Sequence, residues 1–427
     1  MEKIIKRFCG FIAFFVISSV VCAQADISSP YSRFGIGDVR MNRTNAAIQG
    51  MGGLSSTYFG NTYINPANPA SYAFIDSLSF VFDVSLYYKT AKFETKQMDE
   101  NSSNASLDNA NFAFSVTKHW KTGLGLAPLS SMEYEVLIEK YNETGYYCNF
   151  FEGNGGLNEV YWSNGFRILD NLAVGVDAAY IFGTLKEEST IYYPDSMFFL
   201  NGRRTFTNKV KDFRFTLGAI YTLPMKGGNS MTFGLTYKFK NDLNVKRDAF
   251  IRNMFVGYGD NVETPVDTFL YAKDQSSSIK MPHSITGGVS FNKGDRLRVG
   301  IDFTYQNWKG FEYNGRSDSI QDAWSVMLGA SYCGSHSLAA PYHKRMTFRA
   351  GLHFDRTYYK LYGENINKFG IAAGFSLPLP RSYTMMNISF EYGQLGTTSK
   401  DLIKQKYFQL TVGMSIHDKW FVKRRYK

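Results

Sequence analysis

Beyond its first residues, the 427-residue sequence has no apolar run that approaches the ~20 residues needed by a membrane-spanning helix. Cysteine is scarce, since two of the four cysteines, Cys9 and Cys22, lie in an N-terminal export signal. The other two are too few for a disulfide framework. Proline is also scarce, with 11 residues, and no Pro/Gly/Ser-rich linker divides the chain. These absences exclude a helical membrane protein, a disulfide scaffold and a string of separate domains.

Motifs for catalysis and cofactor binding are absent too. The six histidines are scattered without metal-ligand spacing, and neither a Gly-x-Ser-x-Gly elbow nor a Walker sequence occurs. The loop sequence Gly153-Asn154-Gly155-Gly156 does not fit a dinucleotide fingerprint. We therefore expect a protein that is not an enzyme and that has no metal or cofactor.

Residues 1–23 have the pattern of a secretory signal peptide. Basic residues at Lys3, Lys6 and Arg7 precede an apolar stretch over 8–21, and Ala23 is small enough for cleavage after it. Lipidation of Cys22 is the alternative. The net charge of +10 would suit nucleic acid, but export argues against that partner. Attraction to anionic surface glycolipid fits the charge better.

Apolar and polar side chains alternate in many segments from residue 76 onward, which places one set on each face of a strand. In residues 408–416 the even-numbered positions are all apolar and the odd-numbered ones are Gln, Thr, Gly and Ser. Many segments are long enough for a tilted membrane crossing. The expected strands begin near residues 76, 107, 121, 157, 171, 208, 229, 280, 295, 321, 345, 366, 383 and 404.

The connections between these segments alternate in length, as in outer-membrane barrels with short periplasmic turns and long external loops. Short turns are expected near 119–121, 169–171, 225–229, 292–295 and 379–382. Long polar loops are expected near 94–106, 136–155, 186–207, 246–279, 309–320, 357–365 and 396–400. A soluble β-sandwich also alternates but gives no reason for this order of loops.

The pattern therefore predicts an all-β protein: an antiparallel transmembrane β-barrel of about 14 strands over residues 76–418, monomeric and located in the outer membrane. Residues 419–427 are expected to be a basic periplasmic tail. Cys148 falls in an expected external loop and Cys333 near the periplasmic end of its strand, too far apart to bridge. We expect two free thiols.

Residues 24–75 precede the strands and lack sustained alternation. They are rich in Gly, Ser, Asn and Ala but also contain aromatic and apolar residues. This content favours a packed N-terminal hatch, or plug, inside the barrel lumen. A disordered periplasmic tail is the alternative.

The segment Gly53-Leu54-Ser55-Ser56-Thr57, followed by Asn65-Pro66-Ala67, resembles the hatch motif of the FadL/TodX family of outer-membrane transport proteins. The spacing is stretched by residues 60–62, and Asn68-Pro69-Ala70 repeats the triplet. The resemblance implies a fourteen-strand barrel that carries long-chain fatty acids or other small hydrophobic compounds through an apolar pocket gated by the hatch. It also implies lateral exit into outer-membrane lipid at a kink in strand three. The alternatives are a carrier or scaffold of a type IX protein secretion system, as in one branch of the family, and a general porin.

Strand three contains Pro128, which cannot donate to a ladder, and a closed barrel has no free edge for it. Pro128 must therefore lie at a bulge or a gap. With the family resemblance, we expect a lateral gap at Gly123, Gly125 and Pro128. A bulge that only shapes the barrel is the alternative.

The expected lumen face carries charges that a hydrophobic lumen would not tolerate unpaired. They are Asp83, Asp177, Arg214, Lys238, Arg298, Asp302, Arg349, Asp355 and Glu391. Three acids at similar height, Asp83, Asp177 and Asp302, suggest ion pairs with the hatch residues Arg33, Arg40 and Arg43. Salt bridges between neighbouring strands are the alternative. The basic residues Arg214, Lys238, Arg298 and Arg349 are candidates to bind a carboxylate on the cargo.

Overall fold

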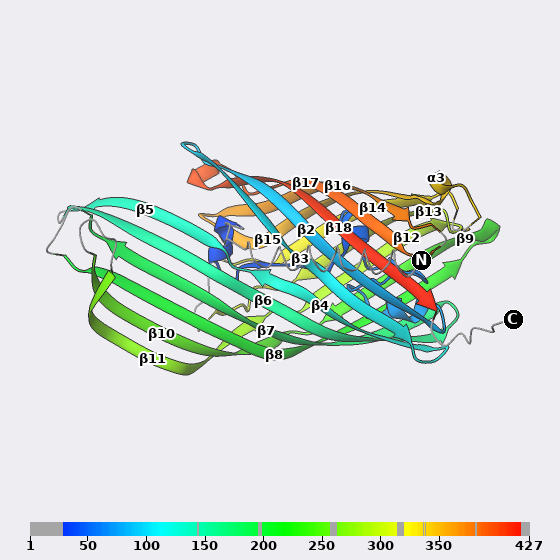
Figure 1. Cartoon of the computed structure of the whole chain (residues 1–427), viewed down its shortest axis with the longest axis horizontal. Coiled ribbons are helices and arrows are strands. Elements are labelled where there is room, and N and C mark those ends of the chain that lie inside the picture. Colours follow the sequence, from blue (N-terminus) through cyan, green and yellow to red (C-terminus); the bar gives the residue numbers. More distant parts are fainter. Residues whose placement is uncertain are drawn as a thin grey trace.

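The computed structural model describes residues 29–142, 145–194, 199–256, 263–313, 320–335, 337, 339–380 and 382–419. The expected signal peptide and nearly all of the expected basic tail lie outside these residues. The described chain forms one closed antiparallel barrel (Figure 1), because the last strand, β18 (Lys404–Lys419), pairs along its length with β2 (Ser79–Glu94). No helix in the described part is long and apolar enough to cross a membrane.

Fourteen strands make the wall, and three of them are interrupted by two residues each. The interrupted strands are β4 (Trp120–Ser131) with β5 (Tyr134–Asn142), β9 (Asn229–Lys238) with β10 (Asn241–Val256), and β11 (Glu263–Met281) with β12 (Ser284–Lys293). The others, besides β2 and β18, are β3 (Asp99–Ser115), β6 (Gly145–Leu169), β7 (Leu172–Tyr192), β8 (Asn201–Pro224), β13 (Leu297–Gln306), β14 (Ala323–Cys333), β15 (Thr347–Leu361), β16 (Glu364–Pro378) and β17 (Met385–Leu395). The expected count of fourteen and the antiparallel order are confirmed.

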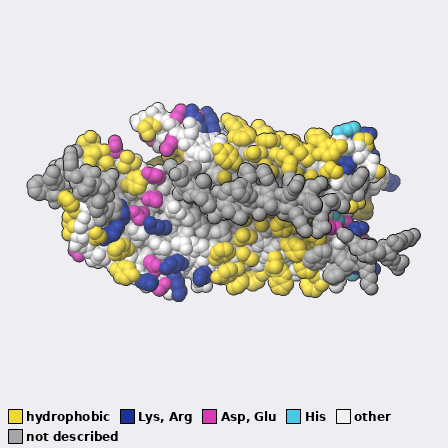
Figure 2. Space-filling view, viewed as in Figure 1, with side chains coloured by type: hydrophobic (Ala, Val, Ile, Leu, Met, Phe, Trp, Pro, Cys, Tyr) yellow, Lys and Arg dark blue, Asp and Glu magenta, His cyan; other side chains and the backbone are white. Residues whose placement is uncertain are grey.

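The alternating pattern places apolar side chains outward and polar ones inward. On β8, Phe213, Phe215 and Leu217 are exposed on the outer surface, whereas Arg214 and Thr216 between them are buried. On the face shown in Figure 2, hydrophobic side chains gather over the part of the barrel towards the short turns, and charged side chains lie mostly beyond them. Such an apolar band is the surface that a bilayer covers.

Five of the expected long loops are wrong. Most of the described residues within 94–106, 136–155, 186–207, 246–279 and 357–365 lie instead in strands that continue past the apolar band and pair with each other. Polar side chains on both faces had suggested loops, but a strand outside the membrane is free to carry polar residues on both faces. Cys148 accordingly lies in β6 rather than in a loop, and both Cys148 and Cys333 are free thiols, as expected.

These continuations form an extension on one side of the barrel, at the end that we call the long-hairpin end (Figure 1). The outer parts of β5, β6, β7, β8, β10 and β11 pair in that order. The opposite end, where the short turns lie, is called the short-turn end.

Residues 29–75, the N-terminal segment, contain little regular structure. Its elements are the 3-10 helices η1 (Pro30–Arg33) and η2 (Pro69–Phe74), the two-residue strand β1 (Asp38–Val39) and the α-helical turn α2 (Ala46–Gln49). The segment packs against inward-facing glycines of the wall. A Cβ on Gly175 would collide with Pro69 and Ala70, and one on Gly351 with Met51. Glycines on the inner face therefore allow the segment to lie against the wall.

Short helices complete the structure outside this segment. The 3-10 helices η3 (Lys226–Gly228) and η4 (Ser399–Asp401) lie in connections between strands, as does the four-residue helix α3 (Tyr342–Arg345).

Candidate functional site

Two repeated triplets give the N-terminal segment its internal structure. Asn65 donates to the carbonyls of Ser55 and Tyr58 at 2.6 and 2.7 Å and accepts from the Ala67 amide at 2.9 Å. Asn68 repeats this arrangement, donating to Ser56 O and accepting from Ala70 N. Each asparagine therefore stabilises its own turn and ties it to the preceding Gly-Leu-Ser-Ser-Thr run. Pro66 follows Asn65 in the first of these turns.

Asp302 on β13 fixes the same run to the wall. Its carboxylate accepts hydrogen bonds from the Ser55 and Ser56 amides at 2.8 and 2.7 Å and from the Ser56 hydroxyl. All three residues are buried. A carboxylate that accepts several backbone amides is a strong anchor, because each bond is charge-assisted.

We predict that Asp302→Asn loosens this part of the segment, because the charge and one acceptor oxygen are lost. The expected cost is about 1.5–3 kcal/mol of unfolding free energy. Hydrogen–deuterium exchange of residues 53–57 should rise. Asp242→Asn, at an exposed position on β10, is the matched control. Unchanged exchange in Asp302→Asn would contradict the anchor.

Arg43 lies in a buried ionic network. Its guanidinium binds Glu159 at 2.7 Å and Asp177 at 2.9 Å, and it stacks over the Tyr161 ring at 3.7 Å. Although burial alone lowers the pKa of Arg43, the carboxylates of Asp177 and Glu159 raise that pKa well above its usual value. Arg214 binds the second oxygen of Glu159 at 2.7 Å. Two arginines and two acids therefore form a closed network that links the segment to β6, β7 and β8.

The other expected hatch–acid pairs differ from the prediction. The Asp83 carboxylate accepts hydrogen bonds from the side chains of Asn45 and Ser415 and does not bind an arginine. Arg33 is exposed, and its only described partner is the ring of Phe34. Of the three acids predicted to bind hatch arginines, only Asp177 does so.

The basic residues expected to bind a cargo carboxylate are engaged elsewhere. Lys238 donates to Met41 O at 2.6 Å and to Asn42, and Arg298 donates to Phe59 O at 3.2 Å. Arg349 donates to the hydroxyl of Tyr58 at 3.3 Å. These bonds lead to the N-terminal segment, and neither these residues nor Arg214 lines the cavity described below. Buried carbonyls of an irregular segment need hydrogen-bond donors from elsewhere in the protein. The spacing of basic residues in the sequence does not show which of them will donate to such carbonyls.

The wall is incomplete between β3 and β4. Their pairing runs from Ser115–Lys121 to Ala110–Leu126 and stops there, although β3 continues over residues 99–109 and β4 over 127–131. In its place β1 pairs with β4, Asp38 with Ser131 and Val39 with Ser130, and the Arg40 amide donates to Leu129 O at 3.0 Å. Residues 38–40 therefore cover the β4 edge that β3 leaves unpaired.

Side chains span the same interval. Arg40 binds Asp108 on β3 at 2.6 Å, and Asn104 of β3 donates to Glu133, just beyond β4, at 2.8 Å. These contacts hold the two edges near each other without a backbone ladder.

The expected lateral-gap residues fall on different sides of this boundary. Pro128 lies at a register shift between β4 and β6, as its missing N–H requires, and beside the unpaired edge. Gly123 and Gly125 lie in the paired part of β4 instead. Their inner faces are filled, because a Cβ would collide with Tyr72 at Gly123 and with Tyr161 at Gly125.

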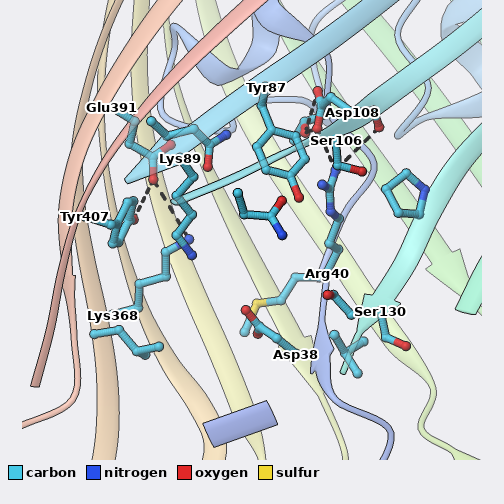
Figure 3. A pocket seen from close by; sticks show the side chains of 18 of the residues that line it. Asp38, Arg40, Tyr87, Lys89, Ser106, Asp108, Ser130, Lys368, Glu391 and Tyr407 are labelled. Carbon is cyan, nitrogen blue, oxygen red and sulfur yellow. Dashed lines mark hydrogen bonds and ion pairs between the residues drawn. The ribbon is translucent and has the colours of Figure 1, made fainter. Parts of the chain in front are cut away.

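A cavity of about 730 Å³ lies behind the incomplete wall (Figure 3). Its lining includes residues 38–42 of the N-terminal segment, residues 102–106 of β3 and Pro128 of β4. Charged and hydroxyl- or amide-bearing side chains make up most of the lining, among them Lys89, Asp108, His353, Lys368 and Glu391. The cavity therefore differs from the wholly apolar pocket that the family resemblance implies, because charged and polar side chains share its lining.

An apolar cluster lies beyond the long-hairpin end of β13. Trp308 and Phe311, from the connection between β13 and β14, are buried, and Trp308 stacks on Tyr358 with ring centroids 4.2 Å apart. Tyr31 and Ile36 join the same cluster. The sequence pattern predicts a polar loop over residues 309–320 and so gives no sign of this cluster.

One residue that lines the cavity, Lys89, could have been placed in the lumen from the sequence. Lys89 shares its strand face with Asp83, which alternation already placed inward, so Lys89 was identifiable as a lumen residue. Asp108 and Glu159 carried no comparable signal. No group of three or more His, Cys, Asp or Glu able to hold a metal occurs in the described ranges.

The chain is similar to known outer-membrane proteins in sequence family and in fold. A protein-family model described as BamG matches residues 4–427. Among solved structures, the Pseudomonas putida toluene transporter TodX is similar with a TM-score of 0.59 and 17% identity, covering 91% of this chain and 100% of that chain. A search of curated proteins found no match.

Two further solved structures have the same fold. The CymD monoaromatic hydrocarbon channel has a TM-score of 0.56 and 15% identity, covering 92% of this chain and 100% of that chain. A Pseudomonas aeruginosa FadL homologue has a TM-score of 0.58 and 12% identity, covering 90% and 100%.

Proposed function

The chain belongs to the BamG family and has the fold of FadL/TodX-type transport proteins, and from this premise we propose that it is an outer-membrane transporter for small hydrophobic or amphiphilic compounds. The observation that carries the proposal is the unpaired interval between β3 and β4, with the cavity directly behind it. A barrel that only sealed or anchored would need no such interruption of its ladder.

In this mechanism the N-terminal segment is a hatch that fills the lumen. Cargo enters from the long-hairpin end after the aromatic layer around Trp308 yields, and it reaches the cavity. It leaves sideways between β3 and β4 when residues 38–40 withdraw from the β4 edge. Few contacts close this gate: the Arg40–Asp108 ion pair, the Asn104–Glu133 hydrogen bond, and the short pairing of residues 38–40 with β4. The interval begins just beyond Leu126 and Val160, at the margin of the outward apolar band.

Uptake measurements test the proposal. Cells that express the protein should accumulate labelled long-chain fatty acid or monoaromatic hydrocarbon faster than cells that lack it. Mass spectrometry of material extracted from the purified protein should find lipid-like ligands. Absence of both results in correctly folded protein would contradict transport.

The expected orientation gives a separate prediction. Cys148 is half-buried near the outer end of β6, whereas Cys333 is buried near the short-turn end. A membrane-impermeant maleimide should therefore label Cys148 on intact cells and leave Cys333 unlabelled, with Cys148→Ser as the control. Labelling of Cys148 only after lysis would reverse the proposed orientation.

The extension favours a second candidate, a carrier or scaffold for secreted proteins. Its terminal strand β11 exposes Phe269 and Tyr271, at 65% and 70%, and its other terminal strand β5 exposes Tyr141. Such aromatic residues at sheet edges are typical of protein contacts. Copurification of secreted proteins that is lost when the β10–β11 hairpin is shortened, with uptake unchanged, would favour this candidate.

A further inference from the structure

We propose that the cavity binds the zwitterionic head group of an amphiphile, with Lys89 binding its anionic group and Asp38 its ammonium. This inference rests on the proposed transport function and names the class of cargo. It depends on which charges in the cavity remain without a partner once the others are paired.

Most charges that line the cavity are already paired. Asp108 is bound to Arg40 at 2.6 Å. His353 lies between two carboxylates, with Asp355 at 2.9 Å from Nδ1 and Glu391 at 3.0 Å from Nε2. These groups neutralise one another and leave no strong preference for a charged ligand.

Lys89 and Asp38 are different. Among the described residues, neither has an ion-pair or side-chain hydrogen-bond partner, and both line the cavity. The Lys89 ammonium lies 5.0 Å from the centroid of the Tyr407 ring, and the ammonium of Lys368 lies 5.3 Å from the same ring. Lys368 is held only loosely by Glu391, at 3.9 Å. One side of the cavity therefore offers two ammonium groups with a single distant carboxylate.

The opposite charges face each other across the space. In Figure 3 Lys89 and Lys368 lie on the side of Tyr407, and Asp38 lies across the view beside Arg40. Asp38 interacts electrostatically with both lysines without touching either. A ligand with an anion and a cation a few bonds apart can bind both groups at once, whereas a ligand with one charge leaves the other group unpaired.

The position of the cavity beside the unpaired strand edges favours an amphiphile over a water-soluble ligand without an acyl chain. Both unpaired strand edges line the cavity, through residues 102–106 of β3 and Pro128 of β4. They lie at the margin of the apolar band, so an acyl chain attached to the head group can extend between them towards lipid. The volume of about 730 Å³ accommodates a head group and the first part of a chain. An unsubstituted hydrocarbon would desolvate these charges without replacing their hydrogen bonds.

Equilibrium binding to the purified full-length chain in a non-ionic detergent tests the inference. The probes are lysophosphatidylethanolamine, oleate and O-phosphoethanolamine. We expect Lys89→Gln to weaken binding of both amphiphiles about tenfold, the effect of one charge-assisted hydrogen bond. Asp38→Asn should weaken the binding of lysophosphatidylethanolamine by a similar factor and leave the binding of oleate unweakened.

Two matched variants at the short-turn end, Lys118→Gln and Asp170→Asn, change exposed charges far from the cavity and should leave all binding unchanged. Heat-modifiable mobility on gels verifies that each variant is folded. The zwitterion assignment fails if Asp38→Asn does not weaken lysophosphatidylethanolamine while oleate still depends on Lys89, and transport then stands. It also fails as an amphiphile assignment if O-phosphoethanolamine binds as tightly as the lysolipid. If the folded protein binds neither amphiphile, the head-group assignment fails, and the transport function fails as well only if cells also show no uptake of labelled fatty acid or hydrocarbon.

Discussion

Replacing Arg43 with methionine should lower the free energy of unfolding by about 3–5 kcal/mol, because it leaves a buried carboxylate without its cation. Asp177 is fully buried and would retain only the Ser163 hydroxyl as a side-chain partner. Glu159 would retain Arg214. Urea unfolding of the protein in lipid vesicles measures the effect, and ion conductance in planar bilayers should rise because the N-terminal segment loses its strongest attachment.

The chain supplies its own controls for this experiment. Arg33→Met removes an exposed arginine of the same segment and should change stability by less than about 0.5 kcal/mol. The double variant Arg43→Met/Asp177→Asn should be more stable than Arg43→Met alone, since the uncompensated charge is gone. Wild-type stability and conductance in Arg43→Met would show that the network does not hold the segment.

The barrel was predictable because its signal is local and repeated. Strict alternation on segments such as 408–416 reports which face each side chain takes, and no long-range information is needed. The strand ends outside the membrane were not predictable in this way. Residues 186–191 and 202–207 carry polar side chains on both faces, as a loop does, yet they pair with each other as strands because the neighbouring strands extend equally far.

The site was only partly predictable, for a related reason. The Asn65-Pro66-Ala67 turn and Pro128 carry backbone constraints that any context must satisfy, so their local roles followed from residue type. The partners of Lys238, Arg298 and Asp302 did not. Each binds a backbone group of the N-terminal segment, and an irregular segment has no periodicity from which its exposed carbonyls and amides can be read.

A disulfide between residues 38–40 and β4 should abolish uptake if cargo leaves through the interval between β3 and β4. Val39 pairs directly with Ser130, and the bond from the Arg40 amide to Leu129 O makes this a non-hydrogen-bonded pair, in which side chains lie closest. Val39→Cys/Ser130→Cys, in a Cys148→Ser/Cys333→Ala background, should therefore oxidise readily. Uptake should fall to the level of cells without the protein and return when the bond is reduced.

The matched control is Phe112→Cys/Leu124→Cys, which links β3 to β4 where they are already paired. It adds a covalent bond to the same wall strand, β4, but joins it to β3 and leaves residues 38–40 unfixed, so uptake should persist after oxidation. Because reduction reverses each cross-link in the same sample, a folding defect is distinguishable from a closed gate. Full uptake through the oxidised Val39→Cys/Ser130→Cys protein would mean that cargo does not pass the β4 edge, and that residues 38–40 are a fixed part of the wall.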